Sequence, residues 1–266
     1  MELKSGLLKI KPDHRDYNLL PTFGLTSIPA FPLEYSTDLE QWMPSQNAMG
    51  APFGCTGFAG ADACSDDDGV IYDPLDLYRR TPPYRDMEGR EMRAMLNVTV
   101  KEGLKCWLLE EGPGYKRTAY FQIRAAGFID SFDAIRLAMI STRVEGRAVI
   151  AGIPWYLIFQ ATTQSGIMHM PYDLSRGYTW HAVKIAGWTT IHGVPYLKIK
   201  SWQGPNFGDQ GWCYMSRELA NILLTTSGAA AFTLTKVEAN QIVRVDLDAV
   251  AIITSYFRRL YERLFN

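Results

Sequence analysis

The sequence has little cysteine, four residues among 266, and no pair of them is spaced Cys-x-x-Cys. Four scattered thiols in a chain of this length do not make a disulfide framework. The missing Cys-x-x-Cys pair excludes the common zinc and thioredoxin-like motifs. We therefore expect free thiols in a reducing compartment, no bound metal and no cofactor. The four are Cys55, Cys64, Cys106 and Cys213.

Positive charge is not in excess, since 27 Lys and Arg stand against 28 Asp and Glu. A nucleic-acid-binding protein carries a basic surface, so this partner class is not expected. No run of 18 or more apolar residues occurs, and we expect no membrane span. The first residues also lack the apolar stretch of a secretory signal. A hydrophobic content of 47% is enough for an ordinary buried core.

Two segments stand apart from the body of the chain. Residues 1–35 are rich in proline and glycine, which predicts an extended N-terminal arm lying on the folded body. The acidic run Ser65–Gly69 is interpreted as a solvated loop. A calcium site is the alternative there, but the spacing does not fit an EF-hand loop.

Helix signals precede strand signals along the chain. Alternating patterns around a turn at His192–Gly193 predict a β-hairpin. Helices first and strands second indicate an α+β protein with two unlike halves. The expected helices cover Cys55–Cys64, Pro74–Tyr78, Glu91–Lys101 and Phe132–Ser141, the last capped by Ser131. The expected strands cover Ala148–Ile153, His181–Trp188 and Tyr196–Trp202.

Cys55 and His181 are the candidate chemical pair. Cys55 lies between glycines at the start of a predicted helix, where the helix dipole favours a thiolate. A lone cysteine is more often a small buried hydrophobe. His181 opens a predicted strand, a context that His14, His169 and His192 lack. A cysteine followed far downstream by a histidine is typical of a nucleophile and its base.

Four segments in order resemble the papain family of cysteine peptidases, most closely its compact bacterial and phage-type members. The resemblance spans about residues 36–216. One segment contains the nucleophile, in Gly-Cys-Thr-Gly-Phe-Ala, and another contains the histidine, in Trp-His-Ala-Val-Lys-Ile-Ala-Gly-Trp. The segments are Asp38–Gln46, Gly54–Ala59, Trp180–Trp188, and Tyr196–Gly204 continued by Phe207–Trp212.

The resemblance implies a two-lobed papain-like fold at residues 36–240. The helical lobe would cover about 36–145 and the β-rich lobe about 146–240. It also implies hydrolysis of a peptide or isopeptide bond in a protein or peptide substrate, through an acyl-thioenzyme. The expected location is the cytoplasm or a virion.

The same resemblance assigns roles to four residues. Cys55 would be the nucleophile and His181 its base, forming a thiolate–imidazolium pair. Gln46 and the Cys55 N–H would donate to the oxyanion. Ser201 falls where the family has an asparagine that orients the histidine.

The sequence departs from the family pattern in ways that leave alternatives open. Ser201 is shorter than asparagine. Nine positions separate Gln46 from Cys55, three more than usual, so Asn47 is a substitute donor. The chain is therefore either an active peptidase or a weakened papain-fold protein with a binding or structural role, for example in a virion. Peptidoglycan peptides are a third substrate class, which would require export.

The two ends fall outside the family pattern. The arm is too short for the usual helical propeptide, so either there is no zymogen or the arm occupies the groove. Residues 241–266 contain a predicted amphipathic helix, Asp246–Phe265, with a short heptad seam. It either docks on the protein's own body or mediates self-association or partner binding.

Overall fold

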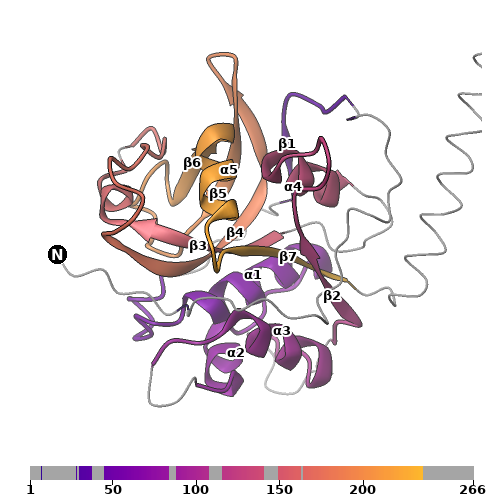
Figure 1. Ribbon diagram of the computed structural model, residues 1–266. Coiled ribbons are helices and arrows are strands. Elements are labelled where there is room, and N and C mark those ends of the chain that lie inside the picture. Colours follow the sequence, from indigo (N-terminus) through magenta and orange to yellow (C-terminus); the bar gives the residue numbers. More distant parts are fainter. Residues whose placement is uncertain are drawn as a thin grey trace, which may run out of the picture.

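The computed structural model describes residues 7, 28, 30–37, 45–83, 88–107, 116–140, 149–162 and 164–235. The predicted C-terminal helix and most of the N-terminal arm lie outside these residues. The described chain forms a helical lobe and a lobe built on a large sheet, which confirms the α+β prediction (Figure 1). No helix in the described residues is long and apolar enough to cross a membrane.

The helical lobe contains α1 (Cys55–Asp68), α2 (Pro74–Arg80) and α3 (Met92–Lys101). All three were predicted. Asp73 caps α2 by accepting the N–H groups of Leu75 and Asp76. Gly57 lets α1 and α2 approach closely, because a Cβ there would lie 2.7 Å from the Pro74 carbonyl oxygen.

The second lobe is an antiparallel sheet in the order β2-β7-β3-β4-β5-β6, with β1 added on β4. The predicted hairpin is β4 and β5, and its turn at His192–Gly193 has φ of 50° and 79°. Two positive φ values identify a type I′ turn, which fits the twist of a hairpin. The strands are β1 (Tyr35–Ser36), β2 (Ala119–Ile123), β3 (Val149–Tyr156), β4 (Tyr178–Ile191), β5 (Val194–Lys200), β6 (Trp212–Ser216) and β7 (Ala230–Thr235).

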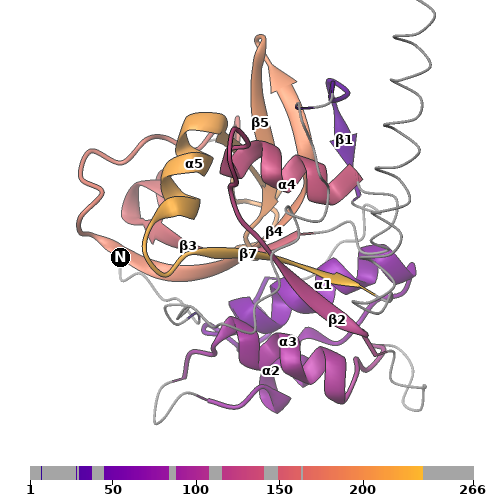
Figure 2. The ribbon, with the colours of Figure 1, turned by 45° about the vertical axis from the view of Figure 1, so that its right-hand side comes forward.

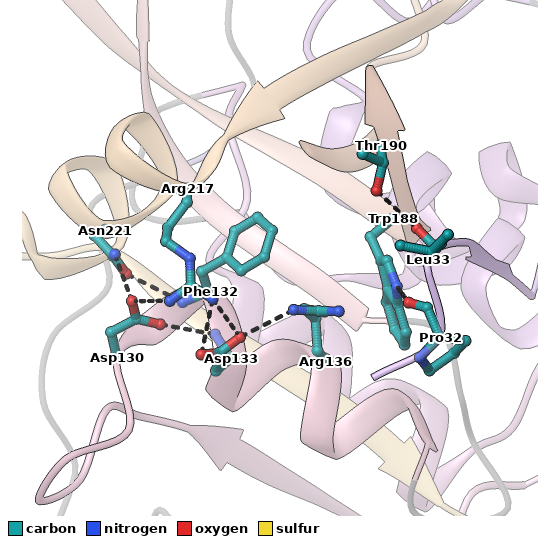
Figure 3. Close-up of polar contacts among 10 residues, drawn as sticks. All are labelled: Pro32, Leu33, Asp130, Phe132, Asp133, Arg136, Trp188, Thr190, Arg217 and Asn221. Atoms are coloured by element: carbon teal, nitrogen blue, oxygen red, sulfur yellow. Dashed lines mark hydrogen bonds and ion pairs between the residues drawn. The ribbon is translucent and has the colours of Figure 1, made fainter. Parts of the chain in front are cut away.

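Two helices cover this lobe, α4 (Ser131–Ile140) and α5 (Arg217–Thr225). Ser131 was expected to cap α4, and this is wrong. Asp130 caps it, since its Oδ1 accepts the Asp133 N–H at 2.8 Å (Figure 3). Asp130 Oδ2 also accepts from Arg217 at 2.7 Å and Asn221 at 2.9 Å, both on α5. Burial raises the pKa of Asp130, but these donors outweigh it and the net shift is downward.

Residues 30–35, the described end of the predicted arm, and the two residues after them lie along β4. A Cβ on Gly187 would approach the Tyr35 carbonyl oxygen to 1.9 Å, so only glycine permits this pairing. The Trp188 indole donates to the Pro32 carbonyl at 2.8 Å (Figure 3). The Arg136 guanidinium lies 3.8 Å from the Phe31 ring centroid. These contacts fasten the arm to the β-rich lobe.

The acidic run at Ser65–Gly69 is not a solvated loop. It is the last turn of α1, ended by Gly69 in the left-handed conformation. Asp66 is 8% exposed, and Asp68 pairs with the buried Arg117 at 2.9 Å. Burial lowers the pKa of Arg117, but the interactions with Cys64 and with the carboxylates of Asp67 and Asp68 outweigh that and raise it. Buried cations face this run of aspartates and compensate its negative charge.

A buried lysine joins the two lobes. Lys184 on β4 is fully buried and pairs with Asp62 at 2.9 Å and with Asp66 at 2.5 Å, both on α1. Asp62 follows Cys55 by about 10 Å of helix, and Lys184 follows His181 by about 10 Å of strand. Cys55 and Ala182 also share one buried cluster. The ion pairs therefore hold the start of α1 beside the start of β4.

Candidate active site

Cys55 is the first residue of α1. Gly54 precedes it with φ −81° and has no capping side chain, so the helix begins with backbone N–H groups around the thiol. The residue is fully buried, and its Sγ lies 4.0 Å from Thr56 Oγ1. A helix start favours negative charge, which suits a sulfur that must ionise.

His181 is the fourth residue of β4 and is 3% exposed. Its Nε2 lies 3.0 Å from the Ser201 backbone oxygen. Because a carbonyl only accepts, Nε2 carries the hydrogen and donates it. The neutral ring then keeps a lone pair on Nδ1, as a general base requires.

Burial sets the charge of His181. It lowers the pKa of the imidazole to about 4, against the opposing effect of the Ser201 hydrogen bond. The centroid of the Trp155 ring lies 4.8 Å from the imidazole centroid, so this ring covers part of the imidazole. At neutral pH burial thus favours a neutral imidazole, in place of the imidazolium that the resemblance implied.

Gln46 is 4% exposed and lies in the turn before α1. Its Nε2 donates to the Pro52 carbonyl at 2.8 Å, which leaves the second Nε2 hydrogen as a donor. Its backbone N–H donates to the Trp202 carbonyl at 3.1 Å. The long loop is thus folded back on itself. Asn47, the proposed substitute donor, is exposed.

Contacts join three of the candidate residues directly and reach the helix of the fourth, Cys55. His181 binds the Ser201 carbonyl, and the next residue, Trp202, binds the Gln46 backbone. The Trp202 ring also lies 5.9 Å from the ring of Phe58, one turn after Cys55 in α1. Helix start, histidine strand and glutamine loop therefore meet at the boundary of the lobes.

One buried residue of the N-terminal arm lies beside this cluster. Leu7 is 4% exposed and forms a parallel β-bridge with Arg90. The Arg90 carbonyl accepts from Thr56 Oγ1 at 3.5 Å, next to the nucleophile. Leu7 also belongs to the buried cluster that contains Cys55.

Part of the chain matches a known protein family. Residues 131–232 match the family model of the papain family cysteine proteases. The match includes His181 and Ser201 and ends in β7. No curated protein matches the chain by sequence.

Solved structures extend the likeness over the helical lobe. Xylellain, a cysteine protease from Xylella fastidiosa, is 18% identical with a TM-score of 0.66, covering 88% of this chain and 97% of that one. The chain has a papain-like fold. Procathepsin L2 from Tenebrio molitor gives 0.63 at 17% identity, covering 86% and 77%. Bromelain from Ananas comosus gives 0.59 at 14%, covering 77% and 99%. The family match and the fold together confirm the resemblance to the papain family, while its bacterial and phage-type refinement stays a prediction.

The Ser201 side chain is not the group that binds His181, in contrast to the role expected of it at the asparagine position. The backbone carbonyl of Ser201 orients the ring instead, while its buried hydroxyl lies beside the Cys213 thiol. Burial raises the pKa of that thiol to about 12, and the Ser201 contact partly offsets the shift.

Trp202 is the site residue that the sequence analysis did not assign. Its φ is 63°, a left-handed conformation that is a genuine outlier for a bulky side chain. The plane of the 201–202 peptide depends on this angle, so Trp202 helps to aim the carbonyl at His181. The sequence offered one signal of this difference. The family has an asparagine and a serine before the tryptophan, whereas Ser201 alone stands between Lys200 and Trp202.

The first prediction concerns stability against pH. The unfolded imidazole has a pKa near 6.5 and the folded one about 4, so the unfolded state binds the extra proton between these values. The free energy of unfolding should rise by about 3 kcal/mol from pH 4 to 6.5 and stay level for this group above that. Denaturant unfolding of the wild type and of His181→Gln at several pH values measures this change in the free energy of unfolding. The variant should lose this slope, and exposed His192→Gln should keep it; equal slopes in all three would contradict the assignment.

The second prediction separates the two groups of Ser201. Ser201→Ala removes only the hydroxyl and keeps the carbonyl, so the rate of Cys55 alkylation by iodoacetamide should stay within about threefold of the wild type at each pH. His181→Ala provides the reference for a lost base. A loss in Ser201→Ala as large as that in His181→Ala would show that the hydroxyl is the orienting group.

Proposed function

We propose that the protein is a cysteine peptidase that hydrolyses a peptide or isopeptide bond through an acyl-thioenzyme. The observation that carries this proposal is the His181 Nε2 to Ser201 carbonyl bond. It fixes the tautomer that a base needs, on a strand packed against the helix that begins with Cys55. The family match and the papain-like fold support the same class of enzyme.

Each residue has its own role in the proposed reaction. Cys55 Sγ attacks the substrate carbonyl carbon while its proton moves to His181 Nδ1. The Cys55 N–H and the second Nε2 hydrogen of Gln46 stabilise the oxyanion. His181 gives the proton to the leaving amine, and a tetrahedral intermediate collapses to the thioester. Water, deprotonated by His181, then hydrolyses the thioester and releases the thiol.

A neutral resting pair suits this sequence of steps. With the pKa of His181 lowered to about 4 by burial, the ring accepts a proton only when the thiol gives one up. The thiol gives it up as the sulfur attacks. The substrate we propose is a protein or peptide in a reducing compartment, either cytoplasmic or virion-associated. The four free thiols suit such a compartment.

The alternative is a weakened papain-fold protein with a binding or structural role. Cys55 is fully buried and His181 is 3% exposed, so a substrate carbonyl reaches neither in this arrangement. One Gln46 amide hydrogen is also used on the Pro52 carbonyl. An active enzyme must therefore open the groove before substrate binds.

The third prediction tests the peptidase against this alternative. Iodoacetamide labelling at pH 6 followed by mass spectrometry should find Cys55 alkylated faster than free glutathione, whereas Cys64 and Cys213 stay unlabelled because burial raises the pKa of both. Cys55→Ala should abolish cleavage of unfolded casein and keep the melting temperature within a few degrees. Cys106→Ala is the matched control and should cleave normally. Unreactive Cys55 with no casein cleavage would contradict the peptidase proposal and favour the alternative.

The contact of Leu7 supports a second part of the proposal. A substrate chain in extended form would pair with the Arg90 backbone edge, near Thr56 and the nucleophile. Leu7 now occupies that edge and shares the cluster of Cys55. We propose that the arm competes with substrate there, in agreement with the groove-filling alternative raised by the sequence.

The fourth prediction follows from this contact. Leu7→Asp places a carboxylate in a buried apolar position, which should detach this residue from Arg90. Both the casein cleavage rate and the Cys55 labelling rate should then rise severalfold. Leu33→Asp is the control, because Leu33 is 77% exposed. Competition would be excluded by unchanged rates in Leu7→Asp at an unchanged melting temperature, or by rates that rise equally in both variants.

A further inference from the structure

A tryptophan of β3 lies against the imidazole of the candidate active site. Trp155 pairs with Thr179 on β4, which precedes His181 by two residues. Because side chains alternate along a strand, Trp155 and His181 lie on the same face of the sheet. Figure 2 shows β3 and β4 beside each other in the sheet above α1. The centroids of the two rings are 4.8 Å apart and their planes are inclined by 57°, so the indole contacts the group that must take up a proton.

Other aromatic rings hold Trp155 in place. The residue is 2% exposed. Phe159, in the short 3₁₀ helix that follows β3, meets the indole edge to face at a centroid distance of 5.2 Å. Phe207, in the loop after Trp202, lies 6.3 Å from it at an angle of 43°. Because the interior is closely packed around it, the indole has little freedom to turn away from the imidazole.

The charged groups near His181 do not compensate a positive charge on its ring. Among the residues that the structure describes, burial and the Ser201 carbonyl determine the pKa of the imidazole, and no carboxylate contributes. The Cys213 thiol beside Ser201 stays neutral, because burial raises its pKa to about 12. Lys184 and its two aspartates lie on the opposite face of β4, since side chains alternate along the strand. Cys55 is the proton donor of the proposed reaction. An imidazolium formed there therefore depends on neutral groups for its stabilisation.

An aromatic ring is such a neutral group. The face of the ring is negative and attracts a cation within about 6 Å of its centroid, and indole does so most strongly. An imidazolium shares its charge over the whole ring, so the centroid distance of 4.8 Å is the relevant one. The attraction is stronger where water is excluded, and both rings are buried. The neutral imidazole gains much less from this contact, which therefore favours the protonated form.

The indole nitrogen supports this interpretation. Trp155 Nε1 is buried and has no hydrogen-bond partner among the described residues. A buried N–H without a partner destabilises a fold, and phenylalanine would fill most of the same space without this cost. The property that distinguishes tryptophan favourably from phenylalanine at this position is its larger π face beside His181.

We propose that Trp155 is a positioning residue that acts through His181, because the face of its indole stabilises the imidazolium. The proton moves from Cys55 Sγ to His181 Nδ1, so that a thiolate and an imidazolium form together. The inference rests on the proposed peptidase function. It adds what that function leaves open, the group that stabilises the charge on the histidine where the structure offers it no carboxylate.

The first experiment weakens the π face and keeps the shape of the ring. Nonsense suppression places mono-, di- or trifluorotryptophan at position 155 of the full-length Cys55→Ala protein, in which the thiol no longer titrates together with the imidazole. Fluorine withdraws electrons from the face of the ring, so the pKa of His181 should fall with each fluorine, by about one unit over the series. NMR of the histidine ring nitrogens measures this pKa, and His181→Gln identifies the signal.

The same series in the protein with Cys55 intact tests the reaction. A less stable imidazolium lowers the fraction of thiolate, so the rate of Cys55 alkylation by iodoacetamide at pH 7 should fall by up to about tenfold. The kcat for casein cleavage should fall in parallel, whereas KM should change by less than about twofold, because the indole acts through His181. Fluorinated tryptophan at position 188 is the control. Trp188 is also buried but stacks on Tyr35, so neither the pKa of His181 nor the alkylation rate should change.

The outcomes separate this proposal from the peptidase proposal. A pKa of His181 that stays constant or rises with fluorine at position 155 would overturn the role of the indole and leave Trp155 a packing residue. An equal fall in the series at position 188 would also overturn it. A pKa that falls as expected in a protein with unreactive Cys55 and no turnover would support the indole and reject the peptidase. Trp155→Phe keeps a smaller π face and should give an intermediate pKa, which keeps the test decisive if trifluorotryptophan disturbs folding.

Discussion

The buried contact of Lys184 with Asp62 and Asp66 is the constraint on which the two-lobed arrangement depends. It fixes α1 of one lobe to β4 of the other, and those two elements begin close to Cys55 and His181. Buried charges are costly to desolvate, so this pairing adds little to net stability compared with an apolar core. Its role is to align α1 with β4. Loss of one partner would leave an unpaired buried charge, at a cost of about 3–5 kcal/mol, and would loosen the register between the helix and the strand.

The same interaction shows why part of the fold was beyond sequence analysis. The β4–β5 hairpin and the helices α1 to α3 were predicted, because alternation, turn residues and apolar spacing are local signals. The aspartate run after Cys64 was predicted as a solvated loop, because Lys184 and Arg117 lie far from it in sequence. Only the tertiary structure brings these cations to the helix. Strands β2, β6 and β7 were missed for a related reason, since they are short and depend on long-range pairing.

In the candidate site, too, some features were predicted from the sequence and others were not. Cys55, His181 and Gln46 were named from their local sequence and the family resemblance, and the structure brings the start of α1, the start of β4 and the turn of Gln46 to the boundary of the lobes. The orienting group of His181 was assigned to a side chain, whereas the structure supplies a backbone carbonyl. Sequence patterns record side chains and not the direction of peptide planes. The left-handed φ of Trp202 that helps to aim this carbonyl is an outlier that no residue pattern predicts.

Burial and chemistry are coupled at this boundary between lobes. Burial lowers the pKa of His181, and Cys55 is fully buried as well, so packing at this boundary both keeps the ring neutral and covers the thiol. In the proposed reaction, a substrate that opened the boundary between the lobes would admit water and polar groups next to the imidazole. Desolvation would then weaken, and the imidazolium that forms after proton transfer would cost less. Binding of the substrate would therefore provide both access to the thiol and the electrostatic conditions for its attack.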